Sequence, residues 1–364
     1  NRGVVLSATY EARRFGVTSA MPMSRARRVC PQAVVLPPDH ARYSAISAAV
    51  METFRSVTPV VEPLSLDEAF LDVSGAVRAM GSPATIGQHI RDTVHDEQGI
   101  TCSVGVASTK FVAKIASGLA KPDGMVVGPR GEVVPFVQLL PVGALWGVGE
   151  RTEDALLRLG LRTVADIAHT PLATLVRGLG EATGRHLHDL SWGRAPRSVE
   201  HVQREKSIGS DQTFEHDIDD SAEIHRRLLA LSERTASRMR AAGLTGRTLT
   251  LRVRFSDFTT ITRSKTLREP TDSGRAIHEG AEGLFDALGL QRARIRLVGV
   301  RMEKLMEASA SPIQGVIGEP EHGWRDADRA VDRARSRFGS GSVRPASLIE
   351  RDTPTSAGRH RDLS

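Results

Sequence analysis

Cysteine is scarce in this chain of 364 residues, which contains only Cys30 and Cys102. Two isolated cysteines exclude a disulfide framework and a CxxC metal site, and they suit a reducing cytoplasm. Long apolar runs are missing as well: none approaches the ~20 residues that cross a bilayer, and no signal peptide is visible. The sequence therefore predicts a cytoplasmic protein that does not associate with membranes.

Positive charge exceeds negative charge, with a formal net charge of +6 and a pI of about 9.8. A basic balance permits binding to a polyanion such as nucleic acid, but it does not establish it. Hydrophobic residues make up 40% and charged residues 25%, which is ordinary globular composition. The length fits two or three domains.

The pattern of the chain changes twice. Up to residue 135 or so, apolar β-branched runs alternate with helical patterns, which predicts a mixed α/β region. Its expected elements are strands at 3–9, 59–73 and 101–108 and helices at 41–55, 83–97 and from 109 to a stop at Pro122. Short helices punctuated by glycine follow at 137–193.

The remaining sequence predicts a second α/β region and a polar end. A strand–helix–strand–strand–helix–strand order is expected between residues 201 and 306. Its elements fall near 203–214, 221–242, 248–256, 260–268, 273–287 and 293–303. A polar tether and a short amphipathic segment at 325–338 come after it.

Two adjacent acids, Asp67 and Glu68, interrupt the strand-forming stretch SLDEAFLDV at 65–73. Carboxylates within a strand are costly unless they are paired or bind a cation, and neighbouring strand residues point to opposite faces. We therefore predict that 59–66 and 69–73 form a hairpin with both acids at its tip. Such a tip suits Mg²⁺, which takes one or two carboxylates together with substrate phosphates. An exposed turn with two unengaged acids is the alternative.

Two glycine turns, GVG at 147–149 and GLG at 178–180, resemble the helix-hairpin-helix motif. Glycine lets backbone N–H groups at a helix N-terminus approach a phosphate closely, a contact that positions nucleic acid without reading its sequence. Ordinary glycine helix ends are the alternative. The candidate DNA-binding residues here are Gly147, Gly149, Gly178 and Gly180.

Arginine alternates with apolar residues in two predicted strands, RTLTLRVRF at 247–255 and QRARIRLVGV at 291–300. This alternation predicts one sheet face packed on helices and one face that presents arginines, which suits a phosphate backbone. Solvated charges on edge strands are the alternative. The candidate DNA-binding residues here are Arg252, Arg254, Arg294 and Arg296.

Together these stretches resemble the Y-family translesion DNA polymerases, and most of all the DNA polymerase IV branch. The matching stretches follow the order of the family. They are SATYEARRFGVTSAMP (7–22), SLDEAFLDV (65–73), CSVGVASTKFVAKIASGLAKPDG (102–124), LPVGALWGVG (140–149) and REKSIGSDQTF (204–214).

The resemblance implies an α+β multidomain fold shaped like a right hand, with a palm, fingers, a helical thumb with helix-hairpin-helix motifs and a βαββαβ little finger. The implied domains are fingers with a remnant of the N-terminal palm at 1–58, palm at 59–136, thumb at 137–193, linker at 194–202, little finger at 203–306 and a flexible tail with a short helix at 307–364.

The resemblance also implies the chemistry, which is the addition of dNTPs to a primer 3′-hydroxyl in low-fidelity synthesis across damaged DNA. Asp67 and Glu68 would be catalytic ligands of two Mg²⁺ ions, with Glu68 nearest the primer 3′-hydroxyl. Two metal ions neutralise charge on the attacking and leaving oxygens, so the protein needs to supply alignment more than covalent chemistry.

Further site residues are implied for the incoming nucleotide. Tyr10 and Arg13 would contact its triphosphate, with Ser7 a weaker candidate beside them, and Lys121 would reach the phosphates from the other side. These side chains are strong donors to phosphate oxygens.

One departure from the family is serious. The first metal-binding Asp and the aromatic residue that excludes ribonucleotides lie upstream of the YEAR segment in the family, yet only nine residues precede Tyr10 here and none is acidic. We expect the sequence to be a fragment of an active enzyme, because the other site residues persist, and we expect this polypeptide alone to polymerise poorly. The alternative is a non-catalytic DNA-binding accessory that recruits replication factors.

The expected partners are primer–template DNA and dNTPs, bound by a monomer at the nucleoid. Family members often end in a peptide that docks on the sliding clamp. The nearest candidate here, IQGVIG at 313–318, lacks the aromatic anchor of such peptides, so clamp binding is expected from the resemblance alone.

Overall fold

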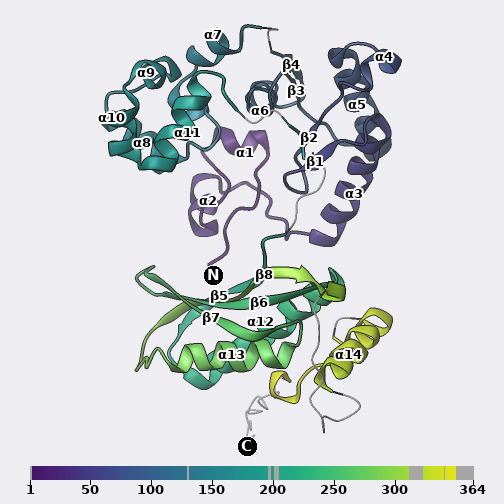
Figure 1. Cartoon of the computed structure of the whole chain (residues 1–364), viewed down its shortest axis with the longest axis vertical. Helices are drawn as coiled ribbons and strands as arrows, with labels where there is room; N and C mark the ends of the chain where they lie inside the picture. The colour runs from purple at the N-terminus through teal and green to yellow at the C-terminus, as the bar shows by residue number, and fades with distance from the viewer. Residues whose placement is uncertain are drawn as a thin grey trace, which may run out of the picture. The chain divides into compact units, whose positions relative to one another are not determined.

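The computed structural model describes residues 2–128, 131–195, 198–200, 205–310, 323–339 and 341–349. The chain forms two compact units, one of residues 36–203 and one that joins residues 1–35 to residues 204–364 (Figure 1). The division at residue 35 falls inside the expected fingers, and the expected domain limits remain a prediction. No helix within the described ranges is long and apolar enough to cross a membrane.

The unit of residues 36–203 begins with an α/β region. Asp39 starts its first helix by accepting a hydrogen bond from Arg42 N (3.0 Å), and Ser82 starts another through Thr85 N (3.1 Å). Both helices confirm the predictions at 41–55 and 83–97. The elements are α3 (His40–Val57), β1 (Val61–Pro63), β2 (Ala69–Leu71), α4 (Val77–Met80), α5 (Pro83–Gln98), β3 (Val104–Val106), α6 (Lys110–Leu119) and β4 (Met125–Val127).

Strands β1 and β2 form the predicted antiparallel hairpin, in which Pro63 lies opposite Ala69. Residues 64–68 make the loop, and this places Asp67 and Glu68 at the tip as expected. The strands are shorter than predicted, since each has only three residues.

Helix α6 connects β3 to β4, which pair in parallel. Gly105 in β3 has no room for a side chain, because a Cβ there would lie 1.9 Å from the Ala113 carbonyl oxygen of α6. This close approach of helix and strand fixes α6, and with it every side chain that α6 presents to the hairpin.

Residues 133–191 fold into the predicted run of short helices. Leu156, Ile167 and Leu187 are fully buried and share a core with Phe111 of α6, so this region and the α/β region pack on each other. The elements are α7 (Val133–Gln138), η1 (Val142–Ala144), α8 (Glu150–Arg158), α9 (Val164–His169), α10 (Leu172–Leu179) and α11 (Glu181–Ser191).

The N-terminal segment contains α1 (Tyr10–Arg14) and α2 (Met23–Val29). The strand predicted at 3–9 is reduced to an isolated bridge between Val4 and Pro22, with backbone hydrogen bonds on either side of it. Val5 N donates to the Met21 carbonyl oxygen (2.8 Å), and Met23 N donates to the Gly3 carbonyl oxygen (2.9 Å). Val5 is buried in a small core, but the pairing is too short to count as a strand.

Residues 207–307 form the predicted strand–helix–strand–strand–helix–strand domain. Its elements are β5 (Ser207–Ile218), α12 (Ser221–Ala241), β6 (Leu244–Phe255), β7 (Thr260–Thr271), α13 (Gly274–Asp286) and β8 (Ile295–Glu307), followed by η2 (Ala308–Ala310). The sheet is antiparallel with strand order β5-β8-β6-β7. Helices α12 and α13 cover one face (Figure 1), and we call the other the open face.

Helix α14 (Trp324–Phe338) is the short helix expected at 325–338, and η3 (Ala346–Leu348) follows it. The expected tail is flexible, but α14 packs against α12 and the start of α13. Arg240 of α12, whose side chain is 7% exposed, is 2.5 Å from Asp332 and 3.3 Å from Asp328. Asp328 also accepts a hydrogen bond from Gly274 N (3.0 Å).

The contact with Arg240 favours the ionised form of Asp332. Burial acts to raise the pKa of Asp332, but the hydrogen bond and the positive charge of Arg240 outweigh it, so the pKa lies below its ordinary value. Asp332 is therefore charged at neutral pH, and a buried ion pair fixes α14 on the domain.

Replacing Asp328 by Ala is expected to destabilise this domain by roughly 2–3 kcal/mol, because Gly274 N and part of the Arg240 guanidinium lose their acceptor while Asp332 still pairs. Urea unfolding followed by the fluorescence of Trp324, with Trp146→Phe and Trp192→Phe as background, measures the change. Ser336→Ala, at an exposed position of the same helix, is the control. An unfolding midpoint equal to that of the control would show that the buried pair does not anchor α14.

Candidate functional site

The loop of the β1–β2 hairpin is shaped to display two acids. Leu64 N and Ser65 N both donate to the Glu68 carbonyl oxygen (2.8 and 3.3 Å), which closes the loop. The Ser65 hydroxyl donates to the Asp67 carboxylate at 2.6 Å and orients it. Both acidic side chains are exposed at the tip. The adjacent carboxylates are thus available to a ligand, on a loop that two backbone hydrogen bonds close.

Two lysines of α6 neutralise the hairpin. Lys114 Nζ lies 2.8 Å from Glu68 Oε2, and one helical turn earlier Lys110 Nζ lies 2.7 Å from Glu62 Oε2 on β1. The Lys110–Glu62 pair is buried, and the Glu62 carboxylate also accepts from Glu200 N at 2.8 Å. Because lysines four residues apart share one helix face, both ion pairs form at once and clamp the hairpin to α6.

Sequence reasoning missed Lys110 and Lys114. The signal was present, because the stretch KFVAK places both lysines on one face while the residues between them, Phe111 and Val112, are buried. What the sequence did not reveal is that this face lies against the hairpin.

The residues present fit a divalent cation. Asp67 and Glu68 supply hard oxygen donors, and the Lys114 ammonium at Glu68 shows that positive charge is favoured there. No group of three or more His, Cys, Asp or Glu that could hold a metal occurs among the described residues. Two protein carboxylates suit Mg²⁺, which leaves its other positions to water and substrate phosphates.

The residues predicted for the nucleotide belong to two different compact units. In the N-terminal segment, Arg13 donates to the Ala8 carbonyl oxygen (3.0 Å), and its guanidinium lies 5.5 Å from the ring centre of Tyr10. Ser7 is exposed just before this pair. Lys121 belongs to the other compact unit, where it is exposed after the end of α6. Tyr10 and Arg13 therefore contact each other within one unit, and Lys121 is an exposed residue of the other.

Two of the four predicted glycines lie at helix starts. Gly149 is the N-cap of α8 and Gly180 the N-cap of α11, and neither helix has a side-chain cap. Gly147 and Gly180 have φ angles of +93° and +85°, which glycine adopts readily. Gly178 differs: it lies inside α10, where a Cβ would be 2.8 Å from Leu159 Cδ1. Close packing, rather than an exposed N–H, explains glycine at that position.

The open face carries Arg252 and Arg254 of β6 as predicted. Arg252 is 2.8 Å from Asp211 of β5, across Gly299 of the intervening strand. Glycine is required there, because a Cβ at Gly299 would lie 1.7 Å from the Asp211 carboxylate. Arg254 donates to the Thr260 hydroxyl (2.8 Å). Both arginines are therefore held by neighbours while their side chains remain part-exposed.

The predicted positions of Arg294 and Arg296 need correction. β8 begins at Ile295, so Arg294 lies outside the strand; it is 72% exposed and 3.6 Å from Asp217. A bulge leaves Arg296 without a partner, since Arg254 pairs with Leu297 and the next residue pairs with Ile295. Arg296 instead stacks on the Phe258 ring at 4.4 Å. The extra residue ends the simple alternation that the sequence showed.

The same bulge brings in an arginine that was not predicted. Arg301 pairs with Thr250, two residues from Arg252, so it projects on the open face. Val298, Val300 and Met302 are buried on the helix-covered face. Their alternation in the sequence indicates that the residues between them, including Arg301, point to the open face.

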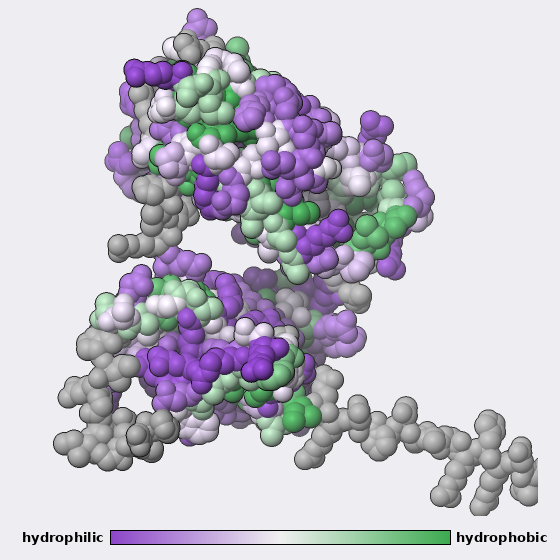
Figure 2. Space-filling view, turned by 90° about the vertical axis from the view of Figure 1, so that its right-hand side faces the viewer, coloured by the Kyte–Doolittle hydropathy of each residue, from purple (hydrophilic) through white to green (hydrophobic). Residues whose placement is uncertain are grey.

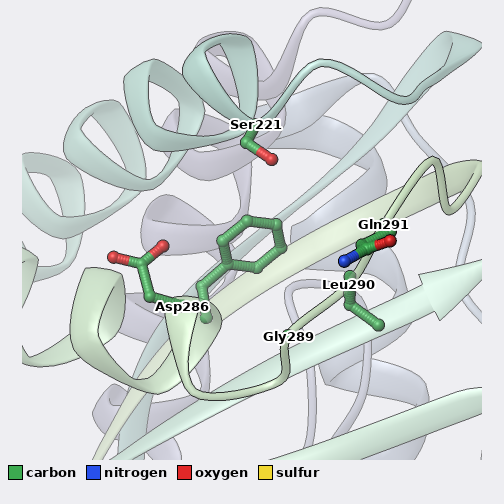
Figure 3. Close-up of a pocket in the computed structure, with 6 residues that line it drawn as sticks. Ser221, Asp286, Gly289, Leu290 and Gln291 are labelled. Atoms are coloured by element: carbon green, nitrogen blue, oxygen red, sulfur yellow. The ribbon is translucent and has the colours of Figure 1, made fainter.

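A pocket between the start of α12 and the end of α13 offers no comparable chemistry (Figure 3). Its lining residues are Ser221, Phe285, Asp286, Gly289, Leu290 and Gln291. Asp286 is already 2.8 Å from His225 Nε2. A single acid that is paired with a histidine does not provide a metal or catalytic site.

Comparison with known proteins decides the family. Residues 1–118 match the model of the impB/mucB/samB family, and residues 205–315 match the model of its C-terminal domain. The DNA polymerase IV of Desulfatibacillum aliphaticivorans is 41% identical over 351 residues, which cover 96% of this chain and 88% of that protein. The DNA polymerase IV of Alkalilimnicola ehrlichii is 43% identical over 305 residues, with 84% and 85% covered.

The chain belongs to the DNA polymerase IV family. Solved structures agree: a Y-family DNA polymerase chimera of Dbh and Dpo4 has a TM-score of 0.73 at 25% identity, with 84% of this chain and 88% of that chain covered. An insertion ternary complex of Dbh DNA polymerase has a TM-score of 0.59 at 25% identity, with 83% and 87% covered. The fold is the α+β fold of the Y-family polymerases, and the domain after residue 205 is its little finger.

Replacing Gly184 of α11 by Ala is expected to destabilise the α10–α11 pair by about 1–3 kcal/mol, because its Cβ would lie 2.8 Å from Val176 N. Gly118→Ala is the control, since Gly118 also lies within a helix and a Cβ there meets nothing within 4 Å. Urea unfolding followed by the fluorescence of Trp192, which directly follows α11, measures both. Equal midpoints for the two variants would contradict the close packing of α10 on α11.

Proposed function

We propose that this DNA polymerase IV homologue, a translesion DNA polymerase, performs its nucleotidyl transfer at the tip of the β1–β2 hairpin. Asp67 and Glu68 are the catalytic carboxylates there. One observation carries the proposal. Two adjacent acids are exposed at the hairpin tip, and Lys114 of α6 lies 2.8 Å from one of them, Glu68. The tip presents oxygen ligands and a nearby positive charge on a fixed backbone.

Phosphoryl transfer asks the protein for alignment and for neutralisation of charge. Asp67 and Glu68 would hold two Mg²⁺ ions, which when bound polarise the phosphoryl oxygens and stabilise the attacking and leaving oxygens. Ser65 keeps the Asp67 carboxylate oriented. The Lys114 ammonium, 2.8 Å from Glu68, offsets part of the negative charge that the two acids place at the tip.

The nucleotide and the DNA have their own proposed contacts. Tyr10 and Arg13, with Ser7 beside them, hold the triphosphate of the incoming dNTP, and Lys121 adds a second positive contact. The phosphate backbone of primer–template DNA is bound by the N–H groups at the α8 and α11 starts and by the arginines of the open face.

The remaining assignments are also proposals. We assign fingers, palm, thumb, linker and little finger as the family resemblance predicts, in a monomer that works on DNA in the cytoplasm. A sliding-clamp contact would use IQGVIG at 313–318, which lies outside the described residues.

Asp67→Ala is expected to lower primer extension by about 100-fold or more, because loss of a metal ligand removes several kcal/mol of transition-state stabilisation. Extension is measured with Mg²⁺ and dNTPs on the protein expressed from its complete reading frame. Asp96→Asn removes an exposed carboxylate of α5 and serves as the control. An unchanged rate for Asp67→Ala would remove the hairpin tip from the active site.

Arg252→Ala combined with Arg294→Ala is expected to weaken DNA binding equally on all sequences. The plot of the logarithm of the association constant against the logarithm of the salt concentration has a negative slope. This slope should become less steep by about 1–2, since each phosphate contact contributes about 0.9. Fluorescence anisotropy with two unrelated duplexes at several salt concentrations tests this. Loss on one sequence only would mean base readout and would contradict a backbone contact.

A further inference from the structure

Helix α14 has acids on the face that packs against the domain and arginines on the exposed face. Its acids are engaged with the protein: Asp328 and Asp332 pair with Arg240, and Asp326 accepts from Gly323 N at the helix start (3.3 Å). Its outward residues Arg329, Arg333 and Arg337 are exposed. Because they follow one another at intervals of four, they lie on one face of the helix. We call these three residues the arginine stripe.

No ion pair to the arginine stripe occurs within the described part of the chain. Like charges four residues apart repel each other, so a helix face built only for solubility would be expected to interleave acids. The stripe is made of arginine, whose planar fork fits phosphate oxygens. Asp326, which accepts from Gly323 N, lies at the start of this face, and no acid follows on it from Arg329 onward. The excess of positive charge along the rest of the face favours an anionic partner.

The helix that carries the stripe is fixed in place. Besides the Arg240 contacts, Arg325 is 3.0 Å from Asp272, and the Trp324 ring lies 4.5 Å from the Arg275 guanidinium. The turn that follows is tied back by Arg335, which donates to the Val343 carbonyl oxygen (3.0 Å). A partner would bind the stripe without having to order the helix first.

The stripe lies on the side of the little finger away from the open face. Helix α14 contacts α12 and α13, which cover the opposite side of the sheet (Figure 1). Viewed from the side where α14 lies, the little finger presents a run of hydrophilic residues (Figure 2). Because a sheet and a helix layer separate the two faces, a duplex held on the open face does not also contact the stripe.

We infer that the arginine stripe is a second DNA-binding surface, which contacts the phosphate backbone of a DNA segment outside the one held by the open face. This inference rests on the proposed function. The stripe extends about 12 Å along the helix, at ~1.5 Å per residue, which matches three or four phosphates of one strand at ~3.4 Å each. Contacts of this kind position DNA without reading its sequence.

The test compares the wild-type chain with the triple variant Arg329→Gln, Arg333→Gln, Arg337→Gln, in which glutamine keeps the helix propensity. Fluorescence anisotropy over a salt series uses three primer–templates: a short one, one with a long single-stranded template, and one with a long duplex. On a long substrate, the salt dependence of the association constant is expected to be weaker for the variant: the slope of its logarithm against log salt becomes less steep by about 2–3. The variant should match the wild type on the short one.

A control variant, Arg42→Gln, Arg55→Gln, Arg78→Gln, removes the same net charge from exposed positions of α3 and α4 and is expected to behave as wild type. Loss confined to the long single strand or to the long duplex supports the inference and identifies the segment. Wild-type behaviour of the stripe variant on both long substrates, or an equal loss on the short one, overturns it. If the wild-type chain binds none of the DNAs, the proposed function itself fails, and this inference fails with it.

Discussion

Helix α6 supplies two lysines to the β1–β2 hairpin, whose tip displays two neighbouring carboxylates. The buried Lys110–Glu62 pair fixes the strand, and the exposed Lys114–Glu68 pair balances the tip. Two neighbouring negative charges repel each other, and the Lys114 ammonium offsets part of that repulsion. The position of α6 is in turn set by its contact with the backbone of β3 at Gly105. The chemistry of the tip therefore depends on the packing of one helix.

The little finger uses charge in two distinct ways. Where a charge is buried, as at Arg240, it is fully paired and fixes one element on another. Where arginines stay part-exposed, as at Arg252, a single acid or hydroxyl holds the side chain without burying it. The buried ion pairs hold α14 against the domain. The exposed arginines create a positive potential that attracts a polyanion.

Local patterns in the sequence predicted much of this. The hairpin, the order of elements in residues 207–307 and the extent of α14 follow from periodicity and turn residues, which act over a few neighbours. The pairing of Lys114 with Glu68 could not be predicted, because it depends on how a helix lies against a hairpin 46 residues away. The bulge at Arg296 was hidden for a similar reason: an extra residue is visible only when both strands are aligned. Of the strand expected at 3–9, only residues 3–5 pair, with residues 20–23, so the strand is reduced to an isolated bridge.

The hairpin tip as a metal site is the central claim, and Mn²⁺ tests it most directly because it prefers the same oxygen ligands as Mg²⁺ and broadens nearby NMR signals. The measurement follows backbone amide signals of the chain during a Mn²⁺ titration in the presence of a dNTP. Residues 64–68 are expected to broaden first, and Asp67→Ala should abolish the effect. Broadening centred elsewhere, or unchanged in Asp67→Ala, would contradict a metal site at the hairpin tip.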